Sequence, residues 1–209
     1  MQNVFVLNHP LNQHKLTLMR SKETTTKDFR DLMGELAMLM TYEVTRDLPL
    51  EETEIETPLT KTKSNVLAGK SLCLVPILRA GLGMVEGVQN LVPSAKVGHI
   101  GLYREHDELK IVEYYSKFPD DIAERDVIIL EPMIASGGSL IAAINIIKAK
   151  GVKRIKVISI VAAHSGIHML ADKFPDIQFF TTAIDNDLND DCYIVPGLGD
   201  AGDRLFGTK

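Results

Sequence analysis

Apolar residues between positions 71 and 183 form short continuous runs, and these runs alternate with stretches of helical spacing. A run without polar alternation is typical of a strand that is covered on both faces, as in a parallel sheet. The runs predict strands at residues 71–76, 96–103, 126–131, 154–162 and 177–183, and the helical spacing predicts helices at 82–91, 139–150 and 165–174. This alternation predicts an α/β fold with a parallel β-sheet flanked by helices.

The N-terminal part follows a helical pattern. Residues 9–20 indicate a short helix or turn, and apolar positions recur at helical spacing over residues 26–47. Thr25 and Asp28 predict a capping box at the start of the second helix. We interpret the apolar stripe of this helix as core packing.

The pattern changes to polar alternation over residues 51–63, which contain Pro58. Proline is excluded from central strands, so this stretch predicts an exposed hairpin arm. Either a second subunit covers the arm or it is a solvated edge hairpin. A second polar stretch, residues 104–118, predicts a flap at the carboxyl edge of the sheet.

Length and composition are those of one globular unit. The chain has 209 residues, of which 45% are hydrophobic, and its mean hydropathy is +0.04. We therefore expect a single domain over residues 1–209, with a core at about 66–183, a hood built from about 1–47 and 184–209, and the arm at about 51–63.

Charge and the lengths of the apolar runs exclude several classes of protein. The net charge is −5 and the pI is about 5.7, which disfavours broad nucleic-acid binding. No apolar run approaches the ~20 residues that span a membrane, and the first residues lack a secretory pattern. We expect a cytoplasmic protein with no membrane partner.

Cysteine and histidine give no metal or disulfide pattern. Cys73 and Cys192 fit neither a disulfide framework nor a metal spacing, and we interpret both as packing residues. His164 and His168 have the i, i+4 spacing of a metal pair, but no glutamate follows the first and no third ligand is evident. We expect no metal site made by the protein alone.

The strand predicted at 126–131 leads into a loop with the residues of an anion site. Glu131 ends the strand, where open α/β sheets bind ligands. Gly137 and Gly138 allow close approach of the backbone, and the N–H groups of the following helix favour an anion. The loop is neither a P-loop nor a dinucleotide-binding turn. The expected ligand is a phosphate.

Two arginines follow neighbouring strands. Arg79 lies in Val75-Pro-Ile-Leu-Arg-Ala-Gly-Leu, between a strand and a helix, where pyrophosphate is a good fit. Arg104 begins the flap and can close over an anionic leaving group. Taken singly, each is equally well explained as a surface charge.

The tail from Tyr193 is rich in small residues, including Gly197, Gly199, Ala201 and Gly202. Such a segment presents bare backbone to a flat, compact ligand. Its apolar residues favour docking on the body over a disordered end.

These segments together resemble the bacterial uracil phosphoribosyltransferases, members of the type I phosphoribosyltransferase family, over the full length of the chain. The matching motifs are His9-Pro-Leu with His14-Lys-Leu, Thr41-Tyr-Glu, Val75-Pro-Ile-Leu-Arg-Ala-Gly-Leu, Tyr103-Arg104, Pro132-Met133 with Gly137-Gly138-Ser139, and Tyr193-Ile-Val-Pro-Gly-Leu-Gly-Asp-Ala-Gly-Asp. The resemblance implies the pyrimidine salvage reaction, in which uracil and phosphoribosyl pyrophosphate (PRPP) give UMP and pyrophosphate. It also implies the type I phosphoribosyltransferase fold.

The resemblance also implies roles for individual residues. Catalysis is assigned to Arg79, Arg104 and Asp200. Uracil is assigned to Ile194, Gly199, Asp200 and Ala201. PRPP is assigned to Arg79, Arg104, Glu131, Pro132, Met133, Ile134, Ala135, Ser136, Gly137, Gly138, Ser139 and Asp200. Further implications are Mg²⁺ carried by PRPP, GTP as an allosteric activator, and a homodimer or higher homo-oligomer.

Backbone groups suit the recognition of uracil. Uracil has two carbonyl acceptors flanking an N3–H donor, which a peptide N–H, C=O, N–H arrangement around Ile194 and Ala201 matches. Cytosine has the opposite polarity at N3 and C4 and leaves buried groups unpaired, a mismatch that discriminates by roughly 10⁴-fold.

Three positions depart from the family pattern. Glu131 stands where the family has aspartate, Ser136 replaces a threonine, and 163–166 reads Ala-His-Ser-Gly in place of Ala-Pro-Glu-Gly. Two alternatives follow: a phosphoribosyltransferase for another base, or a non-catalytic module that senses PRPP or a nucleotide.

Overall fold

The computed structural model describes residues 2–69, 72–104 and 111–208, without the side chains of Arg104 and Asp187. The helices are α1 (Pro10–Arg20), α2 (Thr26–Val44), α3 (Leu82–Leu91), α4 (Gly138–Ala149), α5 (His164–Lys173) and α6 (Ala201–Phe206), with a 3-10 turn at Ile122–Glu124. The strands are β1 (Val4–Val6), β2 (Leu50–Glu56), β3 (Lys61–Leu67), β4 (Cys73–Leu78), β5 (Lys96–Val97), β6 (His99–Arg104), β7 (Ile111–Lys117), β8 (Val127–Leu130), β9 (Met133–Ile134), β10 (Ile155–Ala163), β11 (Gln178–Asp185), β12 (Asp187–Leu188) and β13 (Ile194–Val195).

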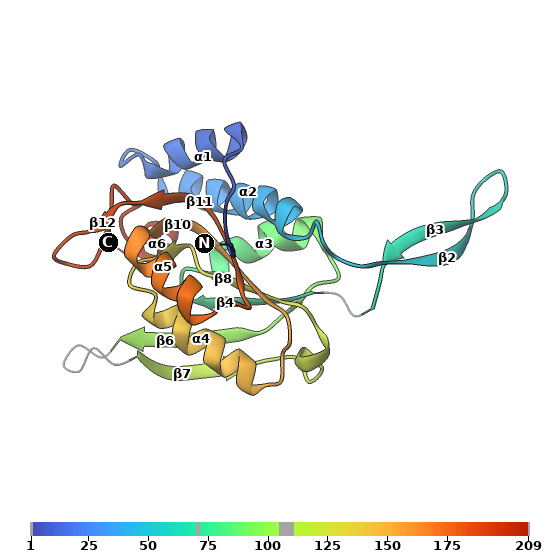
Figure 1. Ribbon diagram of the computed structural model, residues 1–209. Coiled ribbons are helices and arrows are strands. Elements are labelled where there is room, and N and C mark those ends of the chain that lie inside the picture. Colours follow the sequence, from blue (N-terminus) through green and yellow to red (C-terminus); the bar gives the residue numbers. More distant parts are fainter. Residues whose placement is uncertain (1, 70–71, 105–110, 209) are drawn as a thin grey trace.

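The main sheet has the order β1-β11-β10-β8-β4-β6-β7 (Figure 1). Every neighbouring pair along this path is parallel except β6 and β7, which are antiparallel. The predicted parallel sheet flanked by helices is confirmed. β7 comes from the predicted flap, whose residues 105–110 lie outside the described part of the chain.

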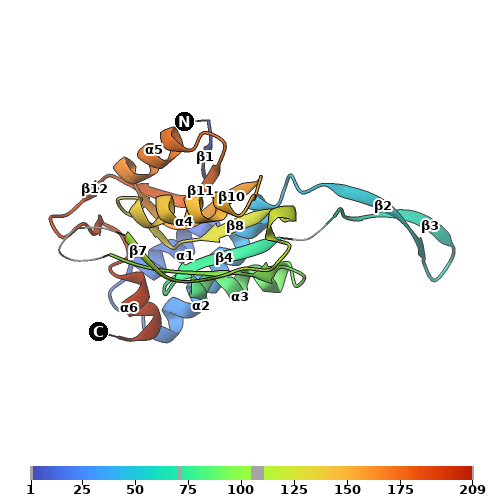
Figure 2. The same cartoon turned by 90° about the horizontal axis from the view of Figure 1, so that it is seen from below.

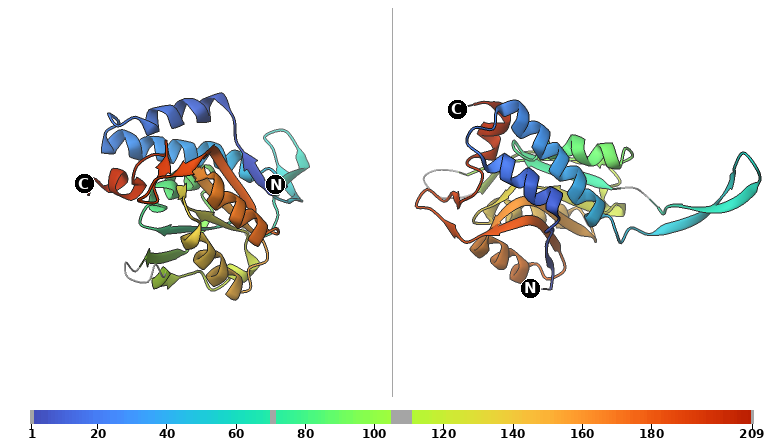
Figure 3. Two further views of the ribbon diagram at one scale, coloured as in Figure 1. Left: turned by 60° about the vertical axis from the view of Figure 1, so that its left-hand side comes forward. Right: turned by 90° about the horizontal axis from the view of Figure 1, so that it is seen from above.

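The central strands of the sheet bury both faces, because helices cover each side (Figure 3). In β8, Ile128 and Leu130 pack with α1, α2 and α3, whereas Val127 and Ile129 pack with α4 and α5. All four side chains are 0–1% exposed. This double coverage is the reason that the strand reads as a continuous apolar run.

The arm is an antiparallel hairpin of β2 and β3, so the predicted hairpin is confirmed. It projects from the body on the side opposite α6 (Figures 1 and 2). Its side chains are almost all exposed, and Leu59 at the tip is 95% exposed.

Both chain ends contribute to one layer above the sheet, where α1 and α2 lie next to the tail (Figure 3). Thr25 caps α2 by accepting a hydrogen bond from the N–H of Asp28 at 3.2 Å, as predicted. The helix ends at Val44 and not at residue 47, because the backbone tightens after Thr45: the N–H of Arg46 donates to the carbonyl of Glu43, and that of Leu48 to Thr45, three residues back instead of four.

Cys73 is buried in β4, as predicted, but the prediction for Cys192 is wrong. Cys192 is exposed and has a φ of 64°, because it lies in the turn between β12 and β13. Within the described ranges, no helix is long and apolar enough to cross a membrane.

Candidate functional site

Two loops meet at the carboxyl edge of the sheet. β4 and β8 are parallel neighbours with Pro76 opposite Leu130, so the loops that follow them leave the sheet side by side. A Cβ atom added to Gly81 would lie 2.4 Å from the carbonyl oxygen of Leu130. The loop that carries Arg79 therefore contacts the end of the strand that precedes Glu131.

The loop of residues 131–139 leads from β8 into α4. Its middle forms β9, which pairs with β10 and so attaches the loop to the sheet. Gly137 has a φ of 80°, and a Cβ atom there would lie 2.9 Å from Cε of Met169 in α5. Only glycine fits both the conformation and the space. The first N–H groups of α4 have no partner inside the helix, and with the hydroxyls of Ser136 and Ser139 they can bind an anion.

Glu131 is partly buried at the start of this loop. Its N–H donates to the carbonyl of Ile158 at 3.1 Å, which fixes the backbone. Burial raises the pKa of its carboxyl to about 8, and a hydrogen bond from the Met133 backbone opposes that rise. Burial therefore disfavours the ionised form of this carboxyl in the absence of ligand.

Arg79 follows β4 directly and is joined to Leu78 by a cis peptide bond. Its side chain is 55% exposed, and Nη2 lies 3.3 Å from Oδ1 of Asp203. The guanidinium also lies 5.8 Å from the ring centroid of Phe206. Both partners belong to α6, so the tail covers the loop that carries the cation.

Asp200 caps α6 by accepting a hydrogen bond from the N–H of Asp203 at 2.8 Å. A Cβ atom added to Gly202 would lie 3.3 Å from Oδ1 of Asp200 and 3.6 Å from Nη2 of Arg79. These two side chains, 121 residues apart in the sequence, are thus both adjacent to Gly202.

The predicted uracil-binding residues lie on the tail. Ile194 is buried in β13 opposite Leu188 of β12, and Ala201 is buried at the start of α6. Gly199 is exposed. A cavity of about 440 Å³ opens beside them, lined by Lys22, Thr24, Thr26, Tyr193, Gly199, Asp200, Asp203 and Arg204.

The anion loop and the tail pack against the same core cluster. Met133 and Ala135 of the loop lie against the core cluster that contains Ile194, Leu198 and Ala201. The structure therefore brings three distant segments to one edge: the Arg79 loop, the loop of residues 131–139, and the tail.

Arg104 is the last residue of β6, and its backbone pairs with Ile111 of β7. Its side chain lies outside the described residues, as does the loop of residues 105–110. The prediction that Arg104 closes over a leaving group stays a prediction.

Asp203 is the site residue that the sequence did not single out. Its side chain is 16% exposed and pairs with Arg79. The tail carries two aspartates, and only the capping pattern of a six-residue helix distinguishes them. Such a helix is too short to give a periodic signal.

His164 and His168 lie on one face of α5, with ring centroids 4.0 Å apart. Within the described residues, no group of three or more histidine, cysteine, aspartate or glutamate side chains is arranged to hold a metal ion. The pair lies on the helix that packs behind Gly137, and it contributes no group to the anion loop.

The edge combines a helix N-terminus for one anion, a cation beside a second loop, and a carboxyl between them. Next to these lies a segment of small residues with exposed backbone. This arrangement suits a ligand with two separate phosphate groups, a polar middle and a flat ring. The groups that the described residues bring here suit orientation and charge stabilisation.

Comparison with known proteins gives one consistent match. A family model described as uracil phosphoribosyltransferase matches residues 6–208. Uracil phosphoribosyltransferases from Clostridioides difficile and from a Geobacillus species are each 58% identical to the chain over 209 residues, with 100% of both sequences covered.

The fold of the chain also matches those of solved structures. The AQ2163 protein from Aquifex aeolicus superimposes with a TM-score of 0.93 at 37% identity, covering 99% of each chain. A hypoxanthine-guanine phosphoribosyltransferase from Bacillus anthracis gives a TM-score of 0.50 at 12% identity, covering 66% of this chain and 72% of that one. The second likeness concerns the fold alone.

Proposed function

Because the chain belongs to the uracil phosphoribosyltransferase family, we propose that it transfers the phosphoribosyl group of PRPP to uracil, giving UMP and pyrophosphate. The protein is then a glycosyltransferase of the pentosyltransferase type. The observation that carries the proposal is the convergence of the Arg79 loop, the loop of residues 131–139 and the small-residue tail at one sheet edge.

PRPP occupies the edge between the two loops in this proposal. The N-terminus of α4 and the hydroxyls of Ser136 and Ser139 bind the 5′-phosphate. Glu131 accepts hydrogen bonds from the ribose hydroxyls, and Arg79 stabilises the charge that develops on the leaving pyrophosphate. These roles are supported by the positions of the groups: Arg79 lies on the loop after β4 and Glu131 on the loop after β8, and the two loops are neighbours at the same sheet edge.

Uracil lies against the tail. The backbone around Ile194 and the segment of residues 199–201 supplies the donor and acceptor pattern that uracil requires. Asp200 lies between the base and PRPP in this proposal, and its position near both Gly202 and Arg79 supports that role. Two roles remain open for it: holding a metal-bound water, or polarising the N1–H of uracil.

Mg²⁺ is part of the proposal as a companion of PRPP. This ion keeps several waters and is bound by one or two carboxylates together with substrate phosphates. Glu131 and Asp200 are carboxylates at the edge, so the residues present fit such a complex. When bound, the ion neutralises part of the pyrophosphate charge.

The proposal is tested by measuring nucleotide formation from PRPP and Mg²⁺ with uracil, cytosine, hypoxanthine and guanine in separate reactions. We expect UMP from uracil and no product from the other bases. The Glu131→Asp variant, run in parallel, tests whether the longer side chain serves as well as aspartate. Product from neither protein would favour the sensing module, and a purine nucleotide would favour another phosphoribosyltransferase.

We also propose that a second copy of the chain covers the arm. An isolated two-stranded hairpin is marginally stable in water, and this one exposes Ile55, Leu59 and Val66. Replacing Ile55 and Leu59 by aspartate should lower the molar mass measured by light scattering. An unchanged oligomer, or a monomeric parent protein, would contradict this.

Activation by GTP, which rests on the family alone, and a cytoplasmic location both stay predictions. The rate of UMP formation with and without GTP tests the first. Fractionation of cells that express the protein tests the second.

A further inference from the structure

Two arginines from different parts of the chain hold two consecutive carbonyl groups of the tail. Nη1 of Arg20, at the end of α1, donates to the carbonyl of Gly197 at 2.9 Å. Nη1 of Arg204, in α6, donates to the carbonyl of Leu198 at 2.9 Å. The backbone between β13 and α6 is therefore fixed from behind by charged side chains.

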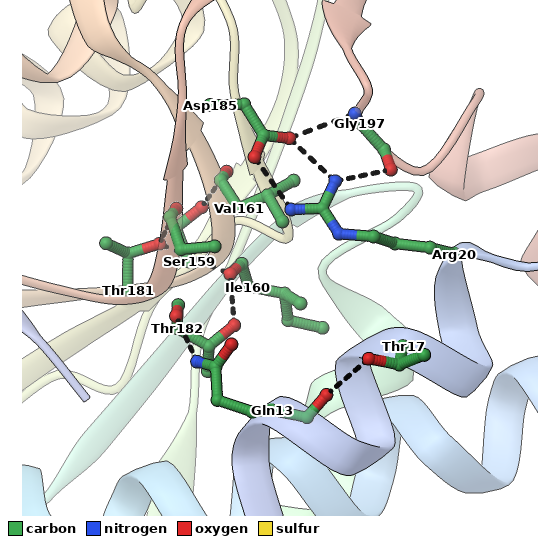
Figure 4. Close-up of polar contacts among 11 residues, drawn as sticks. Gln13, Thr17, Arg20, Ser159, Ile160, Val161, Thr181, Thr182, Asp185 and Gly197 are labelled. Carbon is green, nitrogen blue, oxygen red and sulfur yellow. Dashed lines mark hydrogen bonds and ion pairs between the residues drawn. The ribbon is translucent and has the colours of Figure 1, made fainter. Parts of the chain in front are cut away.

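Asp185, the last residue of β11, completes this arrangement (Figure 4). Its two carboxylate oxygens accept from Nη1 and Nη2 of Arg20, both at 2.7 Å, and Oδ2 also accepts from the N–H of Gly197 at 2.9 Å. Asp185 is 7% exposed. Both polar backbone groups of Gly197 are thus bound to one nearly buried, two-pronged ion pair, the strongest type of charged hydrogen-bonded contact.

The conformation of Gly197 makes this attachment consequential. Its φ is 56°, and a Cβ atom there would lie 2.1 Å from the carbonyl oxygen of Ile194. The chain therefore turns tightly between Ile194 and Gly197, and this turn joins Ile194 to the segment that leads into α6. These are the two places proposed to contact the base.

The same contacts determine where the free amides point. In a trans peptide the C=O and the following N–H point in opposite directions. The N–H groups of Leu198 and Gly199 therefore face away from the arginines that hold the carbonyls of Gly197 and Leu198. Within the described part of the chain, neither N–H donates to a protein acceptor. Gly199 and Arg204 both line the cavity of about 440 Å³.

Arg204 extends the attachment to α1. Its guanidinium also donates to the carbonyl groups of Met19 at 2.7 Å and Ser21 at 2.6 Å, and it lies 4.4 Å from the ring centroid of Phe29. The end of α1 and the tail are consequently one unit, which a displacement of Arg20 would disturb.

We propose that Arg20 and Asp185 are positioning residues for base recognition, which touch no substrate and hold the segment of residues 197–199 so that its amides meet the pyrimidine. This inference rests on the proposed function, since it assigns the support of the same base site. If the pair were purely structural, its loss would destabilise the hood and would not raise the KM for uracil more than the KM for PRPP. The two cases differ in which kinetic constant changes.

The test is steady-state kinetics of Arg20→Lys and Asp185→Asn. Lysine keeps the charge but loses the planar two-pronged contact, and asparagine keeps the shape but loses the charge. A misplacement of about 1 Å can cost on the order of 100-fold. We expect the KM for uracil to rise about 10- to 100-fold, and the uracil-to-cytosine ratio to fall, while the KM for PRPP changes less than about twofold.

Arg125→Lys is the matched control. Arg125 makes a two-pronged pair with Asp121, at 2.9 and 2.8 Å, that is buried to a similar degree. It precedes β8, at the opposite end of the sheet from the site. This variant should lose stability without changing either KM.

PRPP binding, measured by calorimetry without uracil, separates the outcomes. Normal PRPP binding with a raised KM for uracil supports the inference. The inference would be overturned if the KM for uracil were unchanged in both variants, or if the KM values for uracil and for PRPP rose equally. A wild-type protein that makes no UMP would instead overturn the proposed function.

Discussion

The two halves of the site bind their ligands in different ways. The phosphate half presents groups directly: the N-terminus of α4, the carboxyl of Glu131 and the guanidinium of Arg79. The base half presents backbone, and its charged residues, Arg20 and Arg204, hold that backbone from behind. A substitution in the first half removes a ligand contact, whereas one in the second half displaces a surface that remains chemically intact.

The largest effect is expected from removing the cation of the phosphate half. Arg79→Ala should lower kcat by about 10²- to 10³-fold, the usual loss when one group that stabilises transition-state charge is removed. The KM for uracil should change less than kcat, because the contacts of Arg79 with the tail are to the side chains of Asp203 and Phe206. Arg154→Ala, at the opposite end of the sheet, is the control. Full turnover by Arg79→Ala would refute the proposal that Arg79 stabilises the charge on the leaving pyrophosphate.

The next effect comes from breaking the turn of the base half. Gly197→Ala should destabilise the protein by about 1–3 kcal/mol, because an alanine is strained at a φ of 56° and its Cβ meets the carbonyl oxygen of Ile194. Chemical denaturation measures the free energy of unfolding, and the KM for uracil should rise in parallel. A variant with wild-type stability and wild-type KM would show that the turn is not needed.

The phosphate half should also depend on pH through Glu131. The pKa of this carboxyl is raised to about 8, so the ionised fraction in the free protein grows about tenfold between pH 7 and pH 9. We expect kcat/KM for PRPP to rise with pH in that window, since the carboxylate accepts hydrogen bonds better than the neutral acid. Glu131→Gln should lack the rise. If Glu131→Gln showed the same rise in kcat/KM, another titrating group would be responsible for the pH dependence.

Stability should respond to the same carboxyl with the opposite sign. The folded pKa lies above the ordinary value of 4.5, so the folded protein binds more protons than the unfolded chain between these two values. The free energy of unfolding should therefore fall as pH rises from about 4.5 to about 8. Glu131→Gln should flatten this dependence of the unfolding free energy on pH, which chemical denaturation at several pH values measures. An unchanged slope in the variant would contradict the assignment to Glu131.

The smallest effect is a gain. Gly34, in the middle of α2, has nothing within 4 Å of the position of an added Cβ atom. Gly34→Ala should therefore stabilise the protein by about 0.5–1 kcal/mol, because alanine is the better helix former. This variant is the counterpart of Gly197→Ala, and kinetic constants should stay at the wild-type values. A loss of stability would mean that the helix must shift to admit the methyl group.

The difference between the halves also explains what the sequence could predict. The strand run before Glu131, the Gly137-Gly138 pair and the position of Arg79 are local features, and burial on both faces leaves a continuous apolar run. The support of the base half is not local: Arg20 and Asp185 are 165 residues apart, and no pattern in the chain relates them. Asp203 and α6 were missed because six helical residues give no periodicity.

Short elements were missed for the same reason. β12 and β13 have two residues each and pair with each other, so their strand character comes from tertiary structure. Cys192 was misread because an apolar neighbourhood suggested burial, whereas its position in a tight turn exposes it.

A crystal structure with bound UMP tests the account most directly, because one molecule contacts both halves. The account predicts the phosphate within roughly 3 Å of the first N–H groups of α4, the ribose hydroxyls at Glu131, and the base against Ile194 and Ala201. In that structure Arg20 and Asp185 should hold Gly197 and touch no atom of the nucleotide. A base bound away from the tail, or a direct contact from Arg20 to UMP, would contradict it.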